Sequence, residues 1–219
     1  MILAGGRGKR LKPITDYVPK PLVPINNMPI IEWQIKYLKK HYVNEVLICS
    51  GYKTEMIENY LSTKKTGIKV KFSIEKSPLG TGGAIKKAAK MVKDKSFFVM
   101  NGDVITNINL SKLVKTKNAI AAIELQQKFG ILETNGNKIT KFSEKKKIPN
   151  LWMNSGIYHL QKEVVKDLPN RGDIEKTLFP IYAKKGMLDI IKFKNVKWHS
   201  IDSFKDMEES SLEVSKIIK

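Results

Sequence analysis

The sequence predicts an α/β protein with a mostly parallel, doubly wound sheet in its first half and a mixed second half. Short continuous apolar runs at 46–49 and 97–100 are typical of parallel strands that are covered on both faces. Segments with helical periodicity alternate with these runs, which favours right-handed crossovers and a parallel sheet. A chain of 219 residues with 42% hydrophobic residues can bury one full α/β core, so we expect a single domain.

The first half alternates strands with helices. The helix expected at 30–42 places Ile31, Ile35, Leu38 and Tyr42 on one face, with lysines elsewhere. The run at 68–74 alternates apolar and polar residues, as a half-buried strand does. In chain order, we expect strands at 2–4, 46–49, 68–74 and 97–100, and helices at 30–42, 54–61 and 82–91.

The second half is expected to be richer in antiparallel structure. Asn135 and Gly136 lie between two β-prone runs, which predicts a hairpin over 131–142. Further strands are expected at 119–125 and 152–160, and helices at 173–184 and 203–218. In the last helix, we expect four residues at helical spacing to pack in the core: Phe204, Met207, Val214 and Ile218.

Composition narrows the class of function. The formal net charge is +19, but only three of the 40 basic residues are arginines, and the lysines are spread along the whole chain. This pattern is typical of a solvated surface and, without interleaved aromatic residues, does not indicate a nucleic-acid partner. Smaller anionic partners stay open. No run approaches the roughly 18–20 apolar residues that span a membrane, and we expect no signal peptide. The lone Cys49 allows no intramolecular disulfide and fits the reducing cytoplasm.

The opening loop indicates an anion site. Gly5, Gly6 and Gly8 follow the first strand, and Lys9 and Arg10 add positive charge. Glycines let backbone N–H groups approach a phosphate closely, and ligands of such sheets bind at the carboxyl ends of the strands. The loop is not a Walker motif, because G-x-x-x-x-G-K-[ST] is absent, so a tight glycine turn with surface cations is the alternative.

Three later segments strengthen the phosphate interpretation. Lys20 lies between two prolines that fix the backbone around it. Glu75 precedes a second glycine turn at 78–83, which opens the third helix. Asp103 follows a buried strand, where a carboxylate can bind Mg²⁺ beside a phosphate.

In this order, the segments resemble the sugar-phosphate nucleotidylyltransferases, also called sugar nucleotide pyrophosphorylases. The shared pattern is L-A-G-G-x-G-x-R-L, then P-K-P-L, then E-x-x-P-L-G-T-G-G-A, then N-G-D, and residues 1–103 match nearly continuously. Later segments at 142–145, 154–158 and 198–202 match as well. Among the subfamilies, the chain looks most like the mannose-1-phosphate and heptose-1-phosphate guanylyltransferases. The resemblance implies a Rossmann-like fold of the nucleotide-diphospho-sugar transferase type.

The resemblance also implies a reaction and a division of the chain. A sugar-1-phosphate oxygen would attack the α-phosphorus of a nucleoside triphosphate, and pyrophosphate would leave. Residues 1–110 would bind the nucleotide and residues 111–219 the sugar phosphate, with no C-terminal β-helix and no assigned oligomeric state. The implied catalytic residues are Arg10, Lys20 and Asp103. The implied nucleotide-binding residues are Leu3, Ala4, Gly5, Gly6, Gly8, Lys9, Glu75, Gly80 and Thr81. The implied sugar-phosphate residues are Gly130, Glu144, Lys145 and Asn154. Glu175 is a weaker candidate, for which helix capping or a surface position is the alternative.

Two positions depart from the family pattern. Lys9 stands where the family usually has threonine, so a cation replaces a hydroxyl near the phosphates. Ser200 stands where the second metal-binding aspartate of the W-x-D motif is expected. Cytidylyltransferase-like relatives carry that carboxylate two positions later, and Asp202 matches their form. We therefore expect Asp103 and Asp202 to hold Mg²⁺ together, with a one-carboxylate site as the alternative.

Glu75 bears on the choice of base. A carboxylate only accepts hydrogen bonds, and the Watson–Crick edge of guanine offers two adjacent donors where uracil offers one. GTP is therefore favoured, with UTP, CTP and dTTP as alternatives. The sugar follows from the resemblance alone. A catalytically silent nucleotide-sugar sensor is the competing class of function, but the chain keeps Arg10, Lys20 and Asp103.

Overall fold

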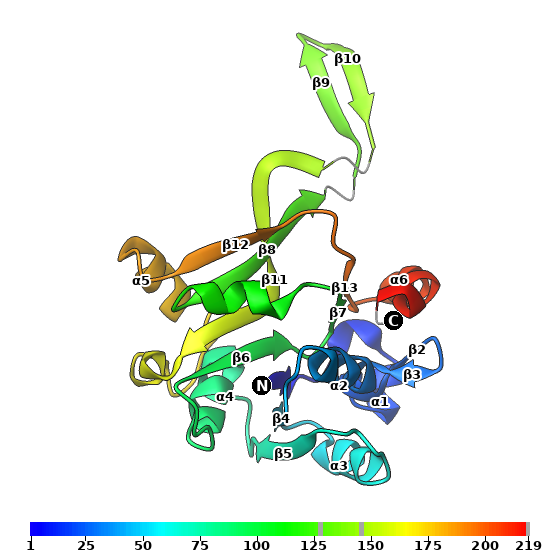
Figure 1. The fold of residues 1–219 in the computed structure, drawn as a ribbon. Coiled ribbons are helices and arrows are strands. Elements are labelled where there is room, and N and C mark those ends of the chain that lie inside the picture. The colour runs from blue at the N-terminus through cyan, green and yellow to red at the C-terminus, as the bar shows by residue number, and fades with distance from the viewer. Residues whose placement is uncertain (127–128, 145–146, 218–219) are drawn as a thin grey trace.

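A seven-stranded mixed sheet organises the computed structural model, which describes residues 1–126, 129–144 and 147–217 (Figure 1). The strand order is β12-β8-β11-β6-β1-β4-β5. Neighbours β6, β1, β4 and β5 run parallel, as do β12 and β8, whereas β11 is antiparallel to both β6 and β8. The sheet strands are β1 (Ile2–Ala4), β4 (Glu45–Ser50), β5 (Lys69–Ile74), β6 (Ser96–Asn101), β8 (Ala119–Gln126), β11 (Lys147–Gln161) and β12 (Asp189–Phe193). The predicted fold class is confirmed.

Helices cover both faces of this sheet. The α-helices are α1 (Ile14–Tyr17), α2 (Ile30–Lys40), α3 (Thr54–Ser62), α4 (Gly80–Ala89), α5 (Leu178–Lys184) and α6 (Phe204–Ile217). On one face, Ile31 and Ile35 of α2 pack with Ile57 of α3 in the core that contains Ile2 and Ile48. A second core on α4 and α5 joins Ile85 and Phe179 to Val99 and Tyr158. The parallel strands are buried between these layers, which explains their continuous apolar runs.

Short ladders and 3₁₀ turns complete the fold. Two short ladders pair β2 (Pro24–Ile25) with β3 (Met28–Pro29), and β7 (Val104–Thr106) with β13 (Trp198–Ser200). The 3₁₀ turns are η1 (Lys9–Leu11), η2 (Lys20–Leu22), η3 (Leu110–Lys115) and η4 (Lys162–Lys166). The β7–β13 pair matters most, because it brings the C-terminal segment beside the turn that follows β6.

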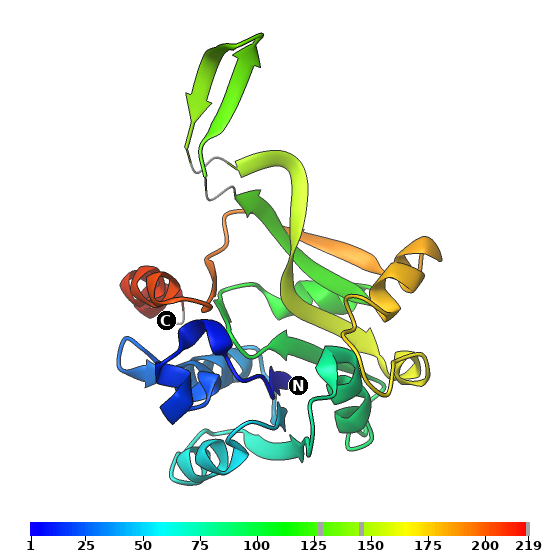
Figure 2. The same cartoon turned by 180° about the vertical axis from the view of Figure 1, so that it is seen from behind.

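The predicted hairpin is present and stands away from the body of the molecule (Figures 1 and 2). It joins β9 (Ile131–Asn135) to β10 (Lys138–Ser143). The two-residue turn consists of Gly136 and Asn137, and Gly136 has a φ of 53°, in the left-handed region that favours glycine. The turn therefore lies one residue later than the predicted Asn135-Gly136 pair.

Some predicted boundaries are wrong. The helix expected at 173–184 begins at Leu178, because residues 173–177 form turns that contact α4. Tyr42 lies beyond the end of α2, with a φ of 59°, and is 90% exposed instead of packing with Ile31. In α6, Val214 is buried and Met207 packs against the core, but Phe204 is 46% exposed. Ile218, for which core packing was predicted, lies outside the described residues. No helix in the described part of the chain is both long enough and apolar enough to cross a membrane.

Candidate active site

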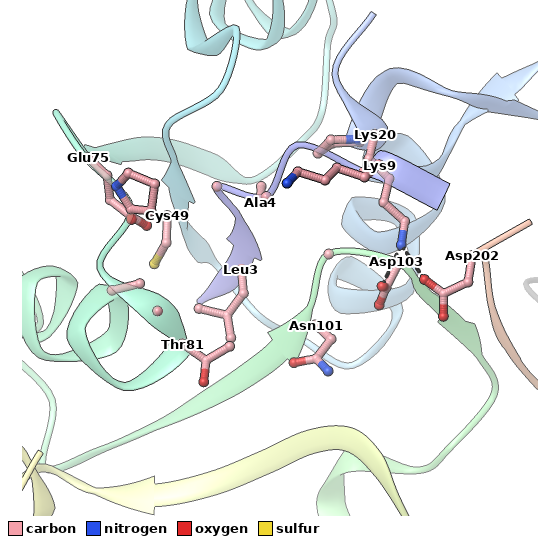
Figure 3. A pocket seen from close by; sticks show the side chains of 18 of the residues that line it. Leu3, Ala4, Lys9, Lys20, Cys49, Glu75, Thr81, Asn101, Asp103 and Asp202 are labelled. Carbon is pink, nitrogen blue, oxygen red and sulfur yellow. Dashed lines mark hydrogen bonds and ion pairs between the residues drawn. The ribbon is translucent and has the colours of Figure 1, made fainter. Parts of the chain in front are cut away.

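The carboxyl ends of β1 and β6 and the loop after β5 open into one cavity of about 440 Å³ (Figure 3). All nine of the predicted nucleotide-binding residues line it, together with Arg10, Lys20, Asp103 and Asp202. These residues come from both ends of the chain, and the parallel pairing of β1 with β6 is what aligns the first glycine loop with the Asp103 turn. The geometry is that of a ligand site at the carboxyl edge of a doubly wound sheet.

Close packing explains two glycines of the opening loop. A Cβ on Gly5 would lie 2.9 Å from Oε1 of Glu75. Gly8 has a φ of 62°, and a Cβ there would lie 2.9 Å from Cγ2 of Thr15, whose hydroxyl donates to the Gly8 carbonyl. A larger residue at either position would push the loop off the cavity wall. The loop keeps its backbone close to the site only because these side chains are missing.

Lys20 lies between two carboxylates at one end of the cavity. Its Nζ is 2.7 Å from Oδ2 of Asp103 and 2.7 Å from Oδ1 of Asp202. Arg10 donates to the same Oδ1 of Asp202 at 2.8 Å, and Ser200 donates to its Oδ2 at 3.0 Å. Burial raises the pKa of Asp202. The hydrogen bond and charge of Lys20, together with Ser200 and Arg10, lower this pKa by more, so it lies below the usual range.

The backbone fixes this meeting of distant residues. Asp202 follows β13, and β13 is antiparallel to β7, which begins directly after Asp103. The N–H of Ile201 donates to the carbonyl of Asp103 at 2.9 Å, and the N–H of Gly102 donates to the carbonyl of Leu3 at 2.9 Å. Asp103 is therefore held to the first and last parts of the chain at once.

The pair Asp103 and Asp202 fits a divalent cation that is shared with a substrate. Mg²⁺ is typically held by one or two carboxylates together with substrate phosphates and water. Among the described residues, no group of three or more His, Cys, Asp and Glu side chains could hold a metal alone. The two carboxylates already gather around one ammonium group, so their oxygens converge on a cationic position.

Glu75 occupies the opposite wall of the cavity from this charged cluster (Figure 3). Its Oε2 accepts a hydrogen bond from the N–H of Leu79 at 2.9 Å. Burial raises the pKa of Glu75, and the Leu79 N–H and the charge of Lys87 offset only part of that effect. The cavity thus has an acceptor at one end and a cluster of cations and carboxylates at the other.

A segment at 171–175 clasps the loop that begins α4. Thr81 donates through its hydroxyl to Oε2 of Glu175 at 2.6 Å and accepts from the N–H of Ile174 at 2.9 Å. Glu175 also accepts from the hydroxyl of Tyr158 at 3.0 Å, and Asn154 donates to that hydroxyl at 2.9 Å. The chain Thr81–Glu175–Tyr158–Asn154 therefore connects the cavity to the second half. Sequence reasoning undervalued Glu175, because its partners are 17 or more residues away.

Arg171 adds to this clasp and was missed by sequence reasoning as a functional candidate. Its guanidinium donates to the carbonyl of Pro78 at 3.1 Å and to the hydroxyl of Ser77 at 3.2 Å. The scarcity of arginine in a lysine-rich chain is the one signal that could have marked it. Arg7, by contrast, lies over the ring of Tyr52, 5.7 Å from its centroid, and does not line the cavity.

The predicted sugar-phosphate residues are not gathered in this cavity. Gly130 and Glu144 are exposed at the base of the β9–β10 hairpin, and Lys145 lies outside the described residues. Asn154 lines a smaller hollow of about 230 Å³ beside Trp152 and Ile190. Lys9, which departs from the family pattern, lines the main cavity from the exposed loop (Figure 3).

Comparison with known proteins decides the family. The model of the nucleotidyl transferase family matches residues 1–216. The chain belongs to this family. The protein is thus a nucleotidyl transferase, and the predicted family and enzyme class are confirmed.

Named relatives and solved structures agree with this assignment. The nucleotidyl transferase is 39% identical over 191 residues to D-glycero-alpha-D-manno-heptose 1-phosphate guanylyltransferase of Campylobacter jejuni, covering 84% of this chain and 86% of that one. It is 33% identical over 222 residues to mannose-1-phosphate guanylyltransferase catalytic subunit beta of Xenopus tropicalis, covering 94% of this chain and 61% of that one. The crystal structure of HddC from Yersinia pseudotuberculosis superposes with a TM-score of 0.79 at 28% identity, covering 97% of each chain. A second structure of that protein is complexed with GMP-PN.

Proposed function

We propose that this nucleotidyl transferase moves a guanylyl group from GTP to a sugar 1-phosphate of the mannose or heptose type. A phosphate oxygen of the sugar 1-phosphate forms a bond to the α-phosphorus, and the bond from that phosphorus to the bridging oxygen of the β-phosphate breaks. The products are a GDP-sugar and pyrophosphate. The observation that carries this proposal is the cavity with Glu75 at one wall and Lys20, Asp103 and Asp202 at the other.

The phosphate end of the cavity suits this chemistry. Phosphoryl transfer needs alignment and charge neutralisation more than covalent help from the protein. The backbone of Gly5, Gly6 and Gly8 would hold the triphosphate, with Lys9 beside it. Arg10, whose side chain is 75% exposed, would leave Asp202 to stabilise the departing pyrophosphate. An exposed ion pair of this kind contributes little stability, so Arg10 can turn to a substrate at small cost.

Lys20 would neutralise negative charge on the α-phosphate. The carboxylates of Asp103 and Asp202 hold its ammonium group in place. Asp103 and Asp202 would hold a divalent cation, for which we propose Mg²⁺. When bound, this ion would neutralise phosphate charge and orient the reacting oxygens. Asp202 remains ionised at neutral pH, since Lys20, Ser200 and Arg10 together hold its pKa below the usual range although burial raises it.

The base end suits guanine. The ionised Glu75 accepts hydrogen bonds at both oxygens, and the N1–H and the exocyclic amine of guanine are two adjacent donors. Leu3, Ala4, Gly80 and Thr81 form the surrounding wall. Two of the named relatives are guanylyltransferases, which supports the same base.

The sugar phosphate is assigned to the second half. Asn154, with Gly130, Glu144 and Lys145, would contact the sugar and its phosphate, and residues 1–110 and 111–219 would divide the two substrates between them. We further propose that the protein works in the cytoplasm on these small molecules rather than on nucleic acid. The free and buried Cys49 is consistent with a reducing compartment.

A substrate panel tests the proposed function. GTP, UTP, CTP and dTTP are each mixed with mannose 1-phosphate, a heptose 1-phosphate and glucose 1-phosphate in the presence of Mg²⁺, and pyrophosphate release is measured. We expect release with GTP and either mannose or heptose 1-phosphate, and none with the Asp103→Asn variant. Nucleotide binding without turnover in any pair would instead support a nucleotide-sugar sensor.

A further inference from the structure

A buried amide outside the cavity holds both ends of the turn that carries Asp103. Gln34 lies in the middle of α2 and is 1% exposed. Its Nε2 donates to the carbonyl of Asn101 at 2.8 Å and to the carbonyl of Val104 at 2.9 Å. One side chain therefore bridges the residue before the turn and the residue after it.

This bridge adds a connection that the strands do not supply. Gly102 ties the turn to β1 and Ile201 ties it to the segment after β13, but neither reaches α2. The first residue of α2, Ile30, donates to the carbonyl of Val23, which directly follows the η2 turn that carries Lys20. Gln34 thus connects the Asp103 turn to the helix whose start is fixed beside the Lys20 turn.

The other end of the Gln34 amide is not satisfied. Within the described residues, its Oε1 is buried and accepts no hydrogen bond. A buried acceptor without a partner destabilises the folded state, and such a group calls for an explanation. An apolar side chain of the same shape would avoid this cost but would lose both hydrogen bonds to the turn. The donors are the part of Gln34 that the site needs.

We propose that Gln34 is a positioning residue for the Asp103–Asp202 pair. By fixing the carbonyls of Asn101 and Val104, it sets the distance of the Asp103 carboxylate from Lys20 and Asp202, and so the affinity of the pair for a divalent cation. This inference rests on the proposed function, which assigns the cation to these two carboxylates. Partners that orient metal ligands typically change metal affinity or activity by about 10–100-fold when they are removed.

The test replaces Gln34 by a side chain of similar shape without donors. Mn²⁺ is titrated into the full chain of wild-type protein and Gln34→Met without nucleotide, and free Mn²⁺ is measured by electron paramagnetic resonance. We expect Mn²⁺ affinity to fall about tenfold. In the transfer assay, kcat should fall by a similar factor while KM for GTP stays within about twofold, because Glu75 and the glycine loop are untouched.

Asn118→Leu is the matched control. Asn118 is also a buried amide, 8% exposed, that bridges two backbone groups: it donates to the carbonyl of Met187 at 3.3 Å and accepts from the N–H of Gln161 at 2.9 Å. It lies outside the cavity. We expect both variants to lower Tm, but only Gln34→Met to weaken Mn²⁺ binding.

The outcomes separate the inference from the function on which it rests. Unchanged Mn²⁺ affinity in Gln34→Met, or an equal loss in Asn118→Leu, would overturn the positioning role and leave a structural one. Wild-type protein that binds Mn²⁺ no better than Asp103→Asn would contradict the metal assignment of the proposed function, and the inference with it. If Gln34→Met does not fold, Gln34→Leu is measured in the same way with the same expected result.

Discussion

We propose that Asp202 supplies the second carboxylate that the resemblance places two positions earlier. Ser200 occupies that position, and its hydroxyl donates to Asp202 at 3.0 Å. The serine therefore orients the replacement carboxylate. Although burial raises the pKa of Asp202, Lys20, Ser200 and Arg10 together lower it more, so this carboxylate stabilises the fold above its unfolded pKa. That stability is lost as the pH falls through the lowered folded pKa.

Substitutions at Asp202 and Ser200 should differ in the size of their effects. Asp202→Asn should weaken Mn²⁺ binding and lower kcat by about 10–100-fold, because one of two carboxylate ligands is lost. Ser200→Ala should change both by no more than about fivefold, since it removes one half-exposed hydrogen bond worth about 1 kcal/mol while Lys20 and Arg10 still hold the Asp202 carboxylate. Mn²⁺ titration and initial rates measure both effects. An Asp202→Asn enzyme with wild-type metal dependence would contradict the assignment.

The proposed contact of Glu75 with the base predicts that GTP binding is sensitive to acid. Burial raises its pKa, so the carboxylate takes up a proton at a higher pH than an ordinary glutamate does. The affinity for GTP should therefore fall as the pH is lowered, and the fall should begin at a pH above the ordinary glutamate pKa of about 4.3. The contacts to the phosphates are not affected by this protonation. In Glu75→Gln this component should disappear, and the preference for GTP over UTP should drop. Competition binding of the two nucleotides as a function of pH measures this, and an unchanged preference would refute the role of Glu75.

At the scale of elements, the start of α4 depends on a segment far away in the chain. The carbonyl of Gly172 accepts from the N–H of Gly82 at 2.9 Å, and the N–H of Gly172 donates to the carbonyl of Leu79 at 2.7 Å. A Cβ on Gly80 would lie 2.6 Å from the carbonyl carbon of Gly172. Close backbone contact explains the glycine at position 80, whereas Gly172 has a φ of 134°, a backbone conformation that favours glycine. Beyond this contact, the N–H of Ile174 and the side chain of Glu175 both bond to Thr81 of α4.

Removing the Glu175 carboxylate should weaken the packing of the cavity wall at the start of α4. In Glu175→Ala, the hydroxyls of Thr81 and Tyr158 each lose their acceptor, and we expect nucleotide affinity to fall about tenfold, with a loss of about 1–3 kcal/mol in the free energy of unfolding. Glu163→Ala removes an exposed glutamate from η4 as a control and should change neither. Calorimetric titration and thermal unfolding measure the two effects, and equal behaviour of the variants would argue against the clasp.

Across the described part of the molecule, the positive charge is dispersed, and a half-buried group of charges lies in the cavity. Exposed lysines such as Lys141 pair locally with single carboxylates, here Glu133 at 2.8 Å. Exposed pairs of this kind contribute little stability. Lys20 differs, because its side chain is only 15% exposed and contacts two carboxylates. The net charge of +19 is therefore a property of the solvated surface, whereas the site depends on a few placed cations.

Local order in the chain determined much of the fold and the cavity. Parallel strands that are buried on both faces need continuous apolar runs, so β4 and β6 could be predicted from the sequence. The loops that follow such strands indicated where a ligand binds. The glycine loop, Lys20, Glu75 and Asp103 were found in this way, because each lies within a few residues of the element that positions it. The β9–β10 hairpin was found from its turn residues.

Only the tertiary structure decided which residues from distant parts of the chain meet at the cavity. The resemblance implied that Asp202 joins Asp103, but the pairing of β13 with β7 is what brings Asp202 to Lys20 as well. The clasp brings Glu175 to Thr81. Gln34 contacts the Asp103 turn from α2 across 67 residues of sequence. These contacts carry no period or local motif, since they depend on the order of strands and the packing of helices on them. The sequence by itself determined the kind of site, and the fold decided which residues complete it.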